Sequence, residues 1–216
     1  MMSPIRFEDW GIVDYQTAWL RQKKLVGEVV AGAGDVLVVC EHPCVITLGR
    51  QAHEQNLLLS RSGLQEKGVP VLSVDRGGDV TLHAPGQMVV YPLVDLKRAG
   101  MGLKKYLINL EQVVVAFLAG FGIVANGDES RRGVWVGNKK IASIGIGVSR
   151  WVSFHGIGLN IATDLSLFRL IRPCGLSVEM TSVSELLHKR VPVSDTKSLF
   201  GEQFVRTFNS DFSVKS

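Results

Sequence analysis

The sequence predicts a single α/β (α+β) domain in which a mixed, mostly antiparallel sheet is flanked by helices. Short apolar and β-branched runs, separated by glycine and proline turns, recur between residues 35 and 161 and indicate strands. Two amphipathic stretches, 14–31 and 102–120, indicate helices. Because no repeat, low-complexity tract or linker interrupts the 216 residues, we expect one domain over 1–216, long enough to bury a sizeable core.

The first part of the chain predicts a helix followed by two strands. In 14–31 the apolar side chains recur at helical spacing and stop at the glycines of 32–34. The continuous apolar run 35–40 is typical of a strand buried on both faces, and a second strand follows at 45–50. Residues 51–70 are polar and irregular, which predicts a loop, with or without a short helix.

Further strands are predicted at 71–74, 80–83 and 87–94, ahead of the helix at 102–120. Residues 133–146 predict a β-hairpin, because a glycine-asparagine turn separates two apolar runs. A strand is then expected at 151–161 and a short helix at 164–171. Ser182 and Glu185 have the spacing of a capping box, and Ser194-Asp195 could cap a last helix to about residue 208.

Composition and charge exclude several classes of protein. Hydrophobic residues make up 46% and charged residues 20%, so a folded chain is expected. Three cysteines argue against a disulfide framework and for a reducing, cytoplasmic location. The N-terminus has no signal-peptide pattern, and no apolar run approaches the roughly 18 residues of a membrane span. The formal net charge of +4 suits an acidic protein partner, and no basic run with interleaved aromatic residues indicates nucleic acid.

Cys174 is the candidate nucleophile. It stands between Pro173 and Gly175, which predict a tight turn, because proline fixes its own φ and glycine tolerates φ > 0. A thiol on such a turn is expected to face a cleft, where a nearby base or cation would activate it. The alternative is a small buried hydrophobic residue, since free cysteines are often buried.

Lys140 is the candidate partner of this thiol. It opens a predicted strand directly after a turn, and the small residues that follow it, 142, 143 and 145, leave space for a ligand. A lysine beside a thiol favours the thiolate and could move a proton in acyl transfer. The alternative is a solvated turn lysine. Because side chains alternate along a strand, only one of Lys139 and Lys140 is expected to face the site.

The densest glycine-rich polar stretch runs from Arg76 to Gln87. Its glycines allow a close approach of the backbone to a ligand, although the spacing is neither that of a Walker loop nor that of a dinucleotide site. A structural hairpin is the alternative. His83 and His155 could line a pocket or serve as hydrogen-bonded structural residues. Residues 40–44 hold two cysteines and a histidine at no standard zinc spacing, so no metal site is expected.

Four motifs together resemble the octanoyltransferases of lipoate biosynthesis. They are Arg76 to Gln87, Lys140 to Gly145, Phe154 to Asn160 and Pro173-Cys174-Gly175, in the order and at about the spacing of that family. Glu41-His42-Pro43 and Thr47-Leu48-Gly49-Arg50 match as well, and the resemblance covers about residues 35–187. Ala84 stands where the family usually has glycine, and Leu82 where an aromatic residue is common.

The resemblance implies the fold of lipoate and biotin protein ligases and transfer of an octanoyl group from octanoyl-acyl carrier protein to a lysine ε-amine. Cys174 would hold the octanoyl group as a thioester, and Lys140 would lower the thiol pKa and shuttle protons. The acceptors would be lipoyl domains of 2-oxoacid dehydrogenase complexes and the glycine cleavage H protein, and no metal or other cofactor is implied. The implied acyl-binding residues are Arg76, Gly77, Gly78, Asp79, Val80, Thr81, Leu82, His83, Ser143, Ile144, Gly145, Gly156, Ile157 and Gly158.

Two other functions fit parts of this pattern. An ATP-dependent lipoate- or biotin-protein ligase would share the fold, but it would activate its acid as an adenylate and would not need Cys174. A non-catalytic acyl-binding protein would keep the pocket, but the presence of both Cys174 and Lys140 argues against it.

Overall fold

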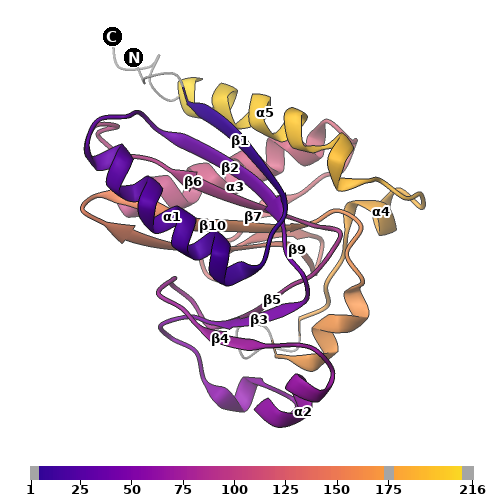
Figure 1. The fold of residues 1–216 in the computed structure, drawn as a ribbon. Helices are drawn as coiled ribbons and strands as arrows, with labels where there is room; N and C mark the ends of the chain where they lie inside the picture. Colours follow the sequence, from indigo (N-terminus) through magenta and orange to yellow (C-terminus); the bar gives the residue numbers. More distant parts are fainter. Residues whose placement is uncertain (1–4, 173–177, 211–216) are drawn as a thin grey trace.

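The computed structural model describes residues 5–172 and 178–210, and seven strands of this part form one large sheet (Figure 1). β1 pairs in parallel with β2, and the other neighbours in the sheet are antiparallel. In sheet order the strands are β1 (Arg6–Ile12), β2 (Val36–Glu41), β6 (Gln87–Leu93), β10 (Val152–Asn160), β9 (Lys139–Ser149), β8 (Val134–Val136) and β7 (Asn126–Gly127).

A smaller sheet lies beside one end of the large sheet (Figure 1). Over the described residues it consists of β4 (Val71–Ser73), β3 (Val45–Leu48) and β5 (Val80–His83), with β3 in the centre. The short helix α2 (Arg61–Glu66) lies beyond it. Leu64 of α2 packs with Ile46 and Leu82 in a core that belongs to this sheet.

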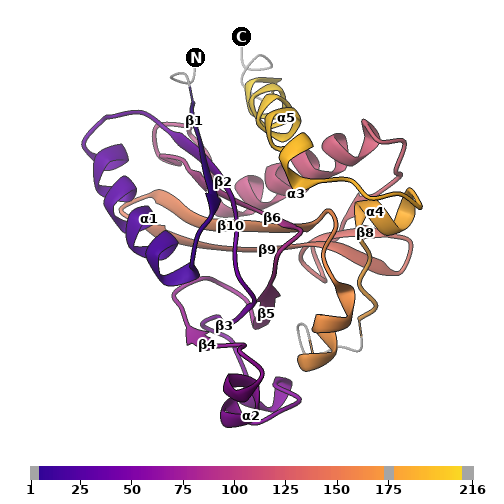
Figure 2. The same ribbon diagram turned by 45° about the vertical axis from the view of Figure 1, so that its right-hand side comes forward.

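Helices cover both faces of the large sheet. On one face lies α1 (Tyr15–Val30), whose N-terminus is capped by Asp14, because the carboxylate accepts a 2.8 Å hydrogen bond from the Thr17 N–H. On the other face lie α3 (Leu103–Ala119) and α5 (Lys197–Ser210), as Figure 2 shows. The larger core lies on the α3 and α5 face and the second core under α1. Besides α2, the short helices of the described residues are α4 (Val183–Leu186) and the 3₁₀ turns Glu54–Asn56, Leu165–Leu170 and Val193–Asp195.

The predicted fold class is confirmed, and most predicted elements are present. Two strands were not predicted: β1, a half-exposed edge strand without an apolar alternation, and β7, which has only two residues. The prediction that Ser194-Asp195 caps the last helix is wrong, because these residues form a separate 3₁₀ turn and α5 begins at Lys197. The capping box is half formed, since Ser182 accepts from the Glu185 N–H while the Glu185 carboxylate accepts from the Thr181 hydroxyl. None of the described helices is long and apolar enough to cross a membrane.

Candidate active site

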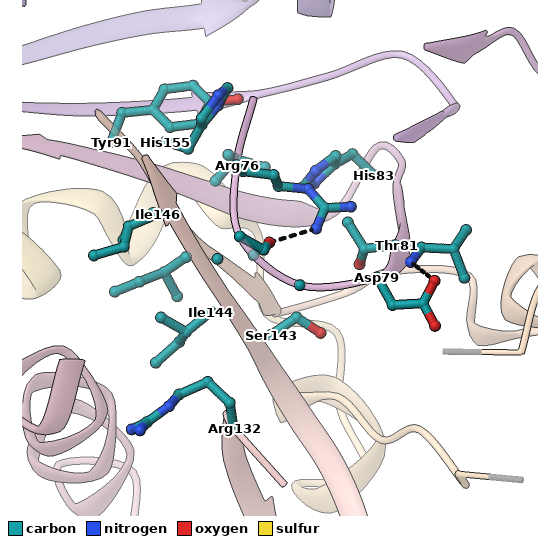
Figure 3. Close-up of a pocket in the computed structure, with 18 of the residues that line it drawn as sticks. Arg76, Asp79, Thr81, His83, Tyr91, Arg132, Ser143, Ile144, Ile146 and His155 are labelled. Carbon is teal, nitrogen blue, oxygen red and sulfur yellow. Dashed lines mark hydrogen bonds between the residues drawn. The ribbon is translucent and has the colours of Figure 1, made fainter. Parts of the chain in front are cut away.

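A cavity of about 250 Å³ is lined by both sheets and by the loop 76–79 (Figure 3). Lys140 and every predicted acyl-binding residue except Leu82 line it. Leu82 is fully buried in the core of the small sheet, because its neighbours Thr81 and His83 on β5 face the cavity and side chains alternate along a strand. The structure thus brings together residues from three of the four sequence motifs.

Glycines allow the loop 76–79 to approach the large sheet closely. Gly145 of β9 pairs with Gly156 of β10, and a Cβ at Gly145 would lie 2.9 Å from the carbonyl oxygen of Gly77. The Gly77 N–H donates a 2.7 Å hydrogen bond to the carbonyl of Ile146 on β9. Cavity walls made of glycine backbone and of Ile144 and Ile157 suit an apolar ligand.

Lys140 is the buried member of the lysine pair. Its side chain is 2% exposed, and its Nζ donates a 2.9 Å hydrogen bond to the carbonyl oxygen of Arg132. Lys139 points the other way and forms an ion pair of 2.7 Å with Glu179. The solvated-turn alternative therefore describes Lys139 and is wrong for Lys140.

The segment that holds Lys140 is itself fastened to α3 by Glu111. The Glu111 carboxylate accepts a 3.1 Å hydrogen bond from the Gly133 N–H. It also forms an ion pair with Arg132, whose Nη1 lies 3.0 Å away at angles unsuited to a hydrogen bond. Gly133 has a φ of 138°, and a Cβ there would lie 2.6 Å from Cε of Lys140. Sequence reasoning missed Glu111, although a carboxylate on the apolar face of a helix was a usable signal.

Arg76 shapes the loop side of the cavity. Its guanidinium donates to the hydroxyl oxygen of Thr47 from Nε (3.1 Å) and Nη2 (2.9 Å), and to the Thr47 carbonyl at 2.7 Å. Asp79 connects the same loop to residues 53–56, because its carboxylate accepts from the His53 N–H and from the Asn56 side chain. The loop is thereby fixed on the small sheet.

His83 and His155 both line the cavity and are both hydrogen-bonded. Each is therefore a pocket residue and a hydrogen-bonded structural residue at once. His83 Nδ1 lies 2.7 Å from Gln87 Oε1, and burial lowers its pKa to about 3. His155 Nε2 lies 2.9 Å from Asp75 Oδ1, and burial lowers the pKa of His155 although Asp75 acts in the opposite direction. Both rings are therefore neutral near pH 7.

The two described cysteines are poor nucleophiles. Cys40 is fully buried in the core under α1, and burial raises the pKa of its thiol. Burial also raises the pKa of the half-buried Cys44 thiol. The predicted nucleophile Cys174 and its turn lie outside the described residues. Within those residues, histidine, cysteine and carboxylate side chains form no group that could hold a metal ion.

The fold and this cavity define a catalytic domain of the lipoate ligase type. Residues 14–205 match the family described as the lipoyl protein ligase A/B catalytic domain, and the chain belongs to that family. Among solved structures, it is similar to lipoate-protein ligase A bound with ATP, with a TM-score of 0.79 and 14% identity over 97% of this chain and 86% of the other. A biotin protein ligase from Aquifex aeolicus has a TM-score of 0.56 at 14% identity, over 100% and 72% of the two chains. These likenesses confirm the predicted fold.

Within that family the chain is similar to proteins named octanoyltransferase. It is 45% identical to the octanoyltransferase of Syntrophobacter fumaroxidans over 208 residues, which cover 95% of this chain and 91% of the relative. It is 39% identical to that of Maridesulfovibrio salexigens, over 94% and 96% of the two chains. The resemblance predicted from the four motifs is confirmed.

Proposed function

We propose that this protein is an octanoyltransferase, an acyltransferase of lipoate biosynthesis that moves an octanoyl group to lipoyl-domain proteins. The octanoyltransferase relatives and the family match support this reaction. The proposed donor is octanoyl-acyl carrier protein. The proposed acceptors are the lipoyl domains of 2-oxoacid dehydrogenase complexes and the glycine cleavage H protein.

The observation that carries the proposal is the buried Lys140 at a cavity whose walls are partly glycine backbone. A lysine that is nearly excluded from water and lines the cavity is placed to act on a carbonyl held there, because charge interactions strengthen away from water. Arg76, Asp79 and the other predicted acyl-binding residues that line the cavity would surround the acyl chain. Leu82 would act only indirectly, through the packing of the small sheet.

The proposed mechanism has two acyl transfers. The thiolate of Cys174 attacks the thioester carbonyl of the donor, a new thioester forms, and the carrier thiolate leaves. The ε-amine of the acceptor lysine then attacks the acylated Cys174, an amide bond forms, and the Cys174 thiolate leaves. Lys140, as an ammonium, would stabilise the Cys174 thiolate and give its proton to the departing carrier thiolate. The neutral amine would then take up the proton released by the attacking acceptor amine, which restores the ammonium.

Intact mass spectrometry tests this mechanism. We expect one added octanoyl group on the protein after incubation with octanoyl-acyl carrier protein, and its loss when apo lipoyl domain is supplied. Cys174→Ala should abolish the adduct, whereas Cys44→Ala, the matched control at a thiol with a raised pKa, should keep it. Amide product formed only from free octanoate and ATP, with no adduct, would instead establish a ligase and refute the role of Cys174.

A further inference from the structure

We propose that the end of the cavity away from Lys140 is a stop that sets the length of the acyl chain. Tyr15, Tyr91 and His155 form this stop, and all three line the cavity (Figure 3 shows Tyr91 beside His155). The identity of the ligand as an acyl chain rests on the proposed function, whereas the position of the stop rests on the geometry.

Strand register places the stop at the far end. The cavity residues of β9 run from Lys140 to Ile146, and Ile146 pairs with His155 on β10. The six residue-to-residue steps from Lys140 to Ile146 span roughly 20 Å, at about 3.3 Å per residue. A thioester with an extended, medium-length acyl chain fits within a distance of that order. A longer chain would meet Tyr91 and His155.

Hydrogen bonds hold the two tyrosine rings in place and use their hydroxyl protons. Nδ1 of His42 lies 2.6 Å from the Val13 carbonyl and must carry a proton, so its Nε2 accepts from the Tyr91 hydroxyl at 2.6 Å. His42 is fully buried and is not part of the cavity wall, so this bond lies behind the stop.

The second tyrosine is held in the same way. His155 donates from Nε2 to Asp75, so its Nδ1 accepts from the Tyr15 hydroxyl at 3.3 Å. With both hydroxyl protons bound to histidines, the wall offers ring surface rather than donors, which suits the methyl end of an acyl chain. Burial lowers the pKa of His42 to about 4, and the three side chains of the stop are uncharged near pH 7.

The backbone at His155 is distorted in a way that places its ring at the stop. His155 has a φ of 55°, which is uncommon for a residue with a side chain. Extending the register of Ile157 with Val90 by two residues puts His155 opposite Pro92, which has no N–H to offer. The His155 N–H donates instead to the side chain of Gln22 on α1, at 2.7 Å. Such strain persists where the surroundings enforce it, and it gathers at functional sites.

Chain-length specificity tests the stop. The assay compares kcat/KM for hexanoyl-, octanoyl-, decanoyl- and dodecanoyl-acyl carrier protein. Tyr91→Leu, which removes the outer part of the ring, should raise the decanoyl-to-octanoyl ratio about tenfold, since two more methylenes can then be buried. Tyr91→Phe, the matched control, keeps the ring and should leave the ratio within about twofold.

A second variant guards against a folding defect in Tyr91→Leu. His155→Asn keeps a residue that tolerates positive φ and shortens the side chain, and it should also raise the ratio. Unchanged ratios in both variants, with cooperative thermal unfolding retained, would overturn the proposal. So would a rise in Tyr91→Phe as large as that in Tyr91→Leu.

A binding measurement separates this proposal from the proposed function. Sodium octanoate, decanoate and dodecanoate are compared for the shift they cause in the thermal midpoint, because a ligand that binds the native state raises it. We expect octanoate to stabilise the wild type more than dodecanoate does, and Tyr91→Leu to reverse that order. Reversal of this order in a protein that transfers no acyl group would support the stop and refute the proposed octanoyltransferase activity. Octanoyl transfer without that reversal would support the proposed activity and refute the stop.

Discussion

Acid should destabilise this protein well above the pH at which carboxylates protonate, because buried neutral histidines lie at the cavity and behind its wall. Burial lowers the pKa of His42 from 6.5 to about 4 and that of His83 from 6.5 to about 3. In the unfolded chain both would take up a proton near pH 6.5. Their contribution to stability is therefore complete above pH 6.5 and is lost as the pH falls towards their folded pKa values.

The expected loss is large compared with the stability of an ordinary domain. At pH 5 each of these two histidines favours the unfolded chain by about 2 kcal/mol relative to pH 7, or about 4 kcal/mol together. Domains of this kind are stable by about 5–15 kcal/mol. The pKa of His155 is also lowered, which adds to the loss, while Asp35, whose pKa burial raises, acts weakly in the opposite direction.

Urea unfolding at pH 7, 6 and 5 measures this dependence. Between pH 6 and 5 the free energy of unfolding should fall with a slope that corresponds to the uptake of two to three protons on unfolding. His83→Gln should lower that number by one. The hydrogen bond from His83 to Gln87 is lost in this variant, so its stability at pH 7 is compared separately. Equal unfolding free energies at pH 7 and pH 5 would refute the conclusion that these histidines are neutral in the folded state.

Three further substitutions test the site. Lys140→Met should lower the rate of octanoyl adduct formation at least about 100-fold, as loss of a general acid or base does, and a rate within threefold of wild type would remove Lys140 from the mechanism. Glu111→Gln should lower kcat more than it raises KM, because Glu111 holds the segment that receives the Lys140 hydrogen bond; an effect on KM alone would argue for a binding role. Gly156→Ala should prevent stable folding, since its Cβ would overlap the Val90 carbonyl, and a normal thermal midpoint would contradict the close approach of these strands.

The sequence was sufficient to predict elements whose pattern is local. The helices at Tyr15–Val30 and Leu103–Ala119 follow from apolar spacing, and the β8–β9 hairpin follows from its glycine-asparagine turn. Cavity residues were predictable where glycines and polar residues gathered in motifs. Leu82 belongs to such a motif, but strand alternation directs its side chain into the core of the small sheet. This detail depends on which face of β5 meets the large sheet.

Residues that act through tertiary contacts could not be predicted in this way. Tyr15 looked like one apolar position of a helix and Tyr91 like one of a strand, yet both line the cavity and bond to histidines far away in the sequence. β1 was not predicted because an edge strand that is half exposed carries no continuous apolar run. These features depend on packing between segments, which a local pattern does not contain.

Several departures from regular sheet structure lie together beside the cavity. Pro92 occupies a central strand, His155 opposite it has a positive φ, and Gly145 and Gly156 pair where larger residues would stabilise the strands better. Each of these features weakens the large sheet, and a sequence selected only for stability would avoid them. Their joint effect is to leave space against the loop 76–79 and to place the His155 ring at the end of that space. The sheet is irregular at the cavity, and this supports the proposal that a ligand binds there independently of any relative.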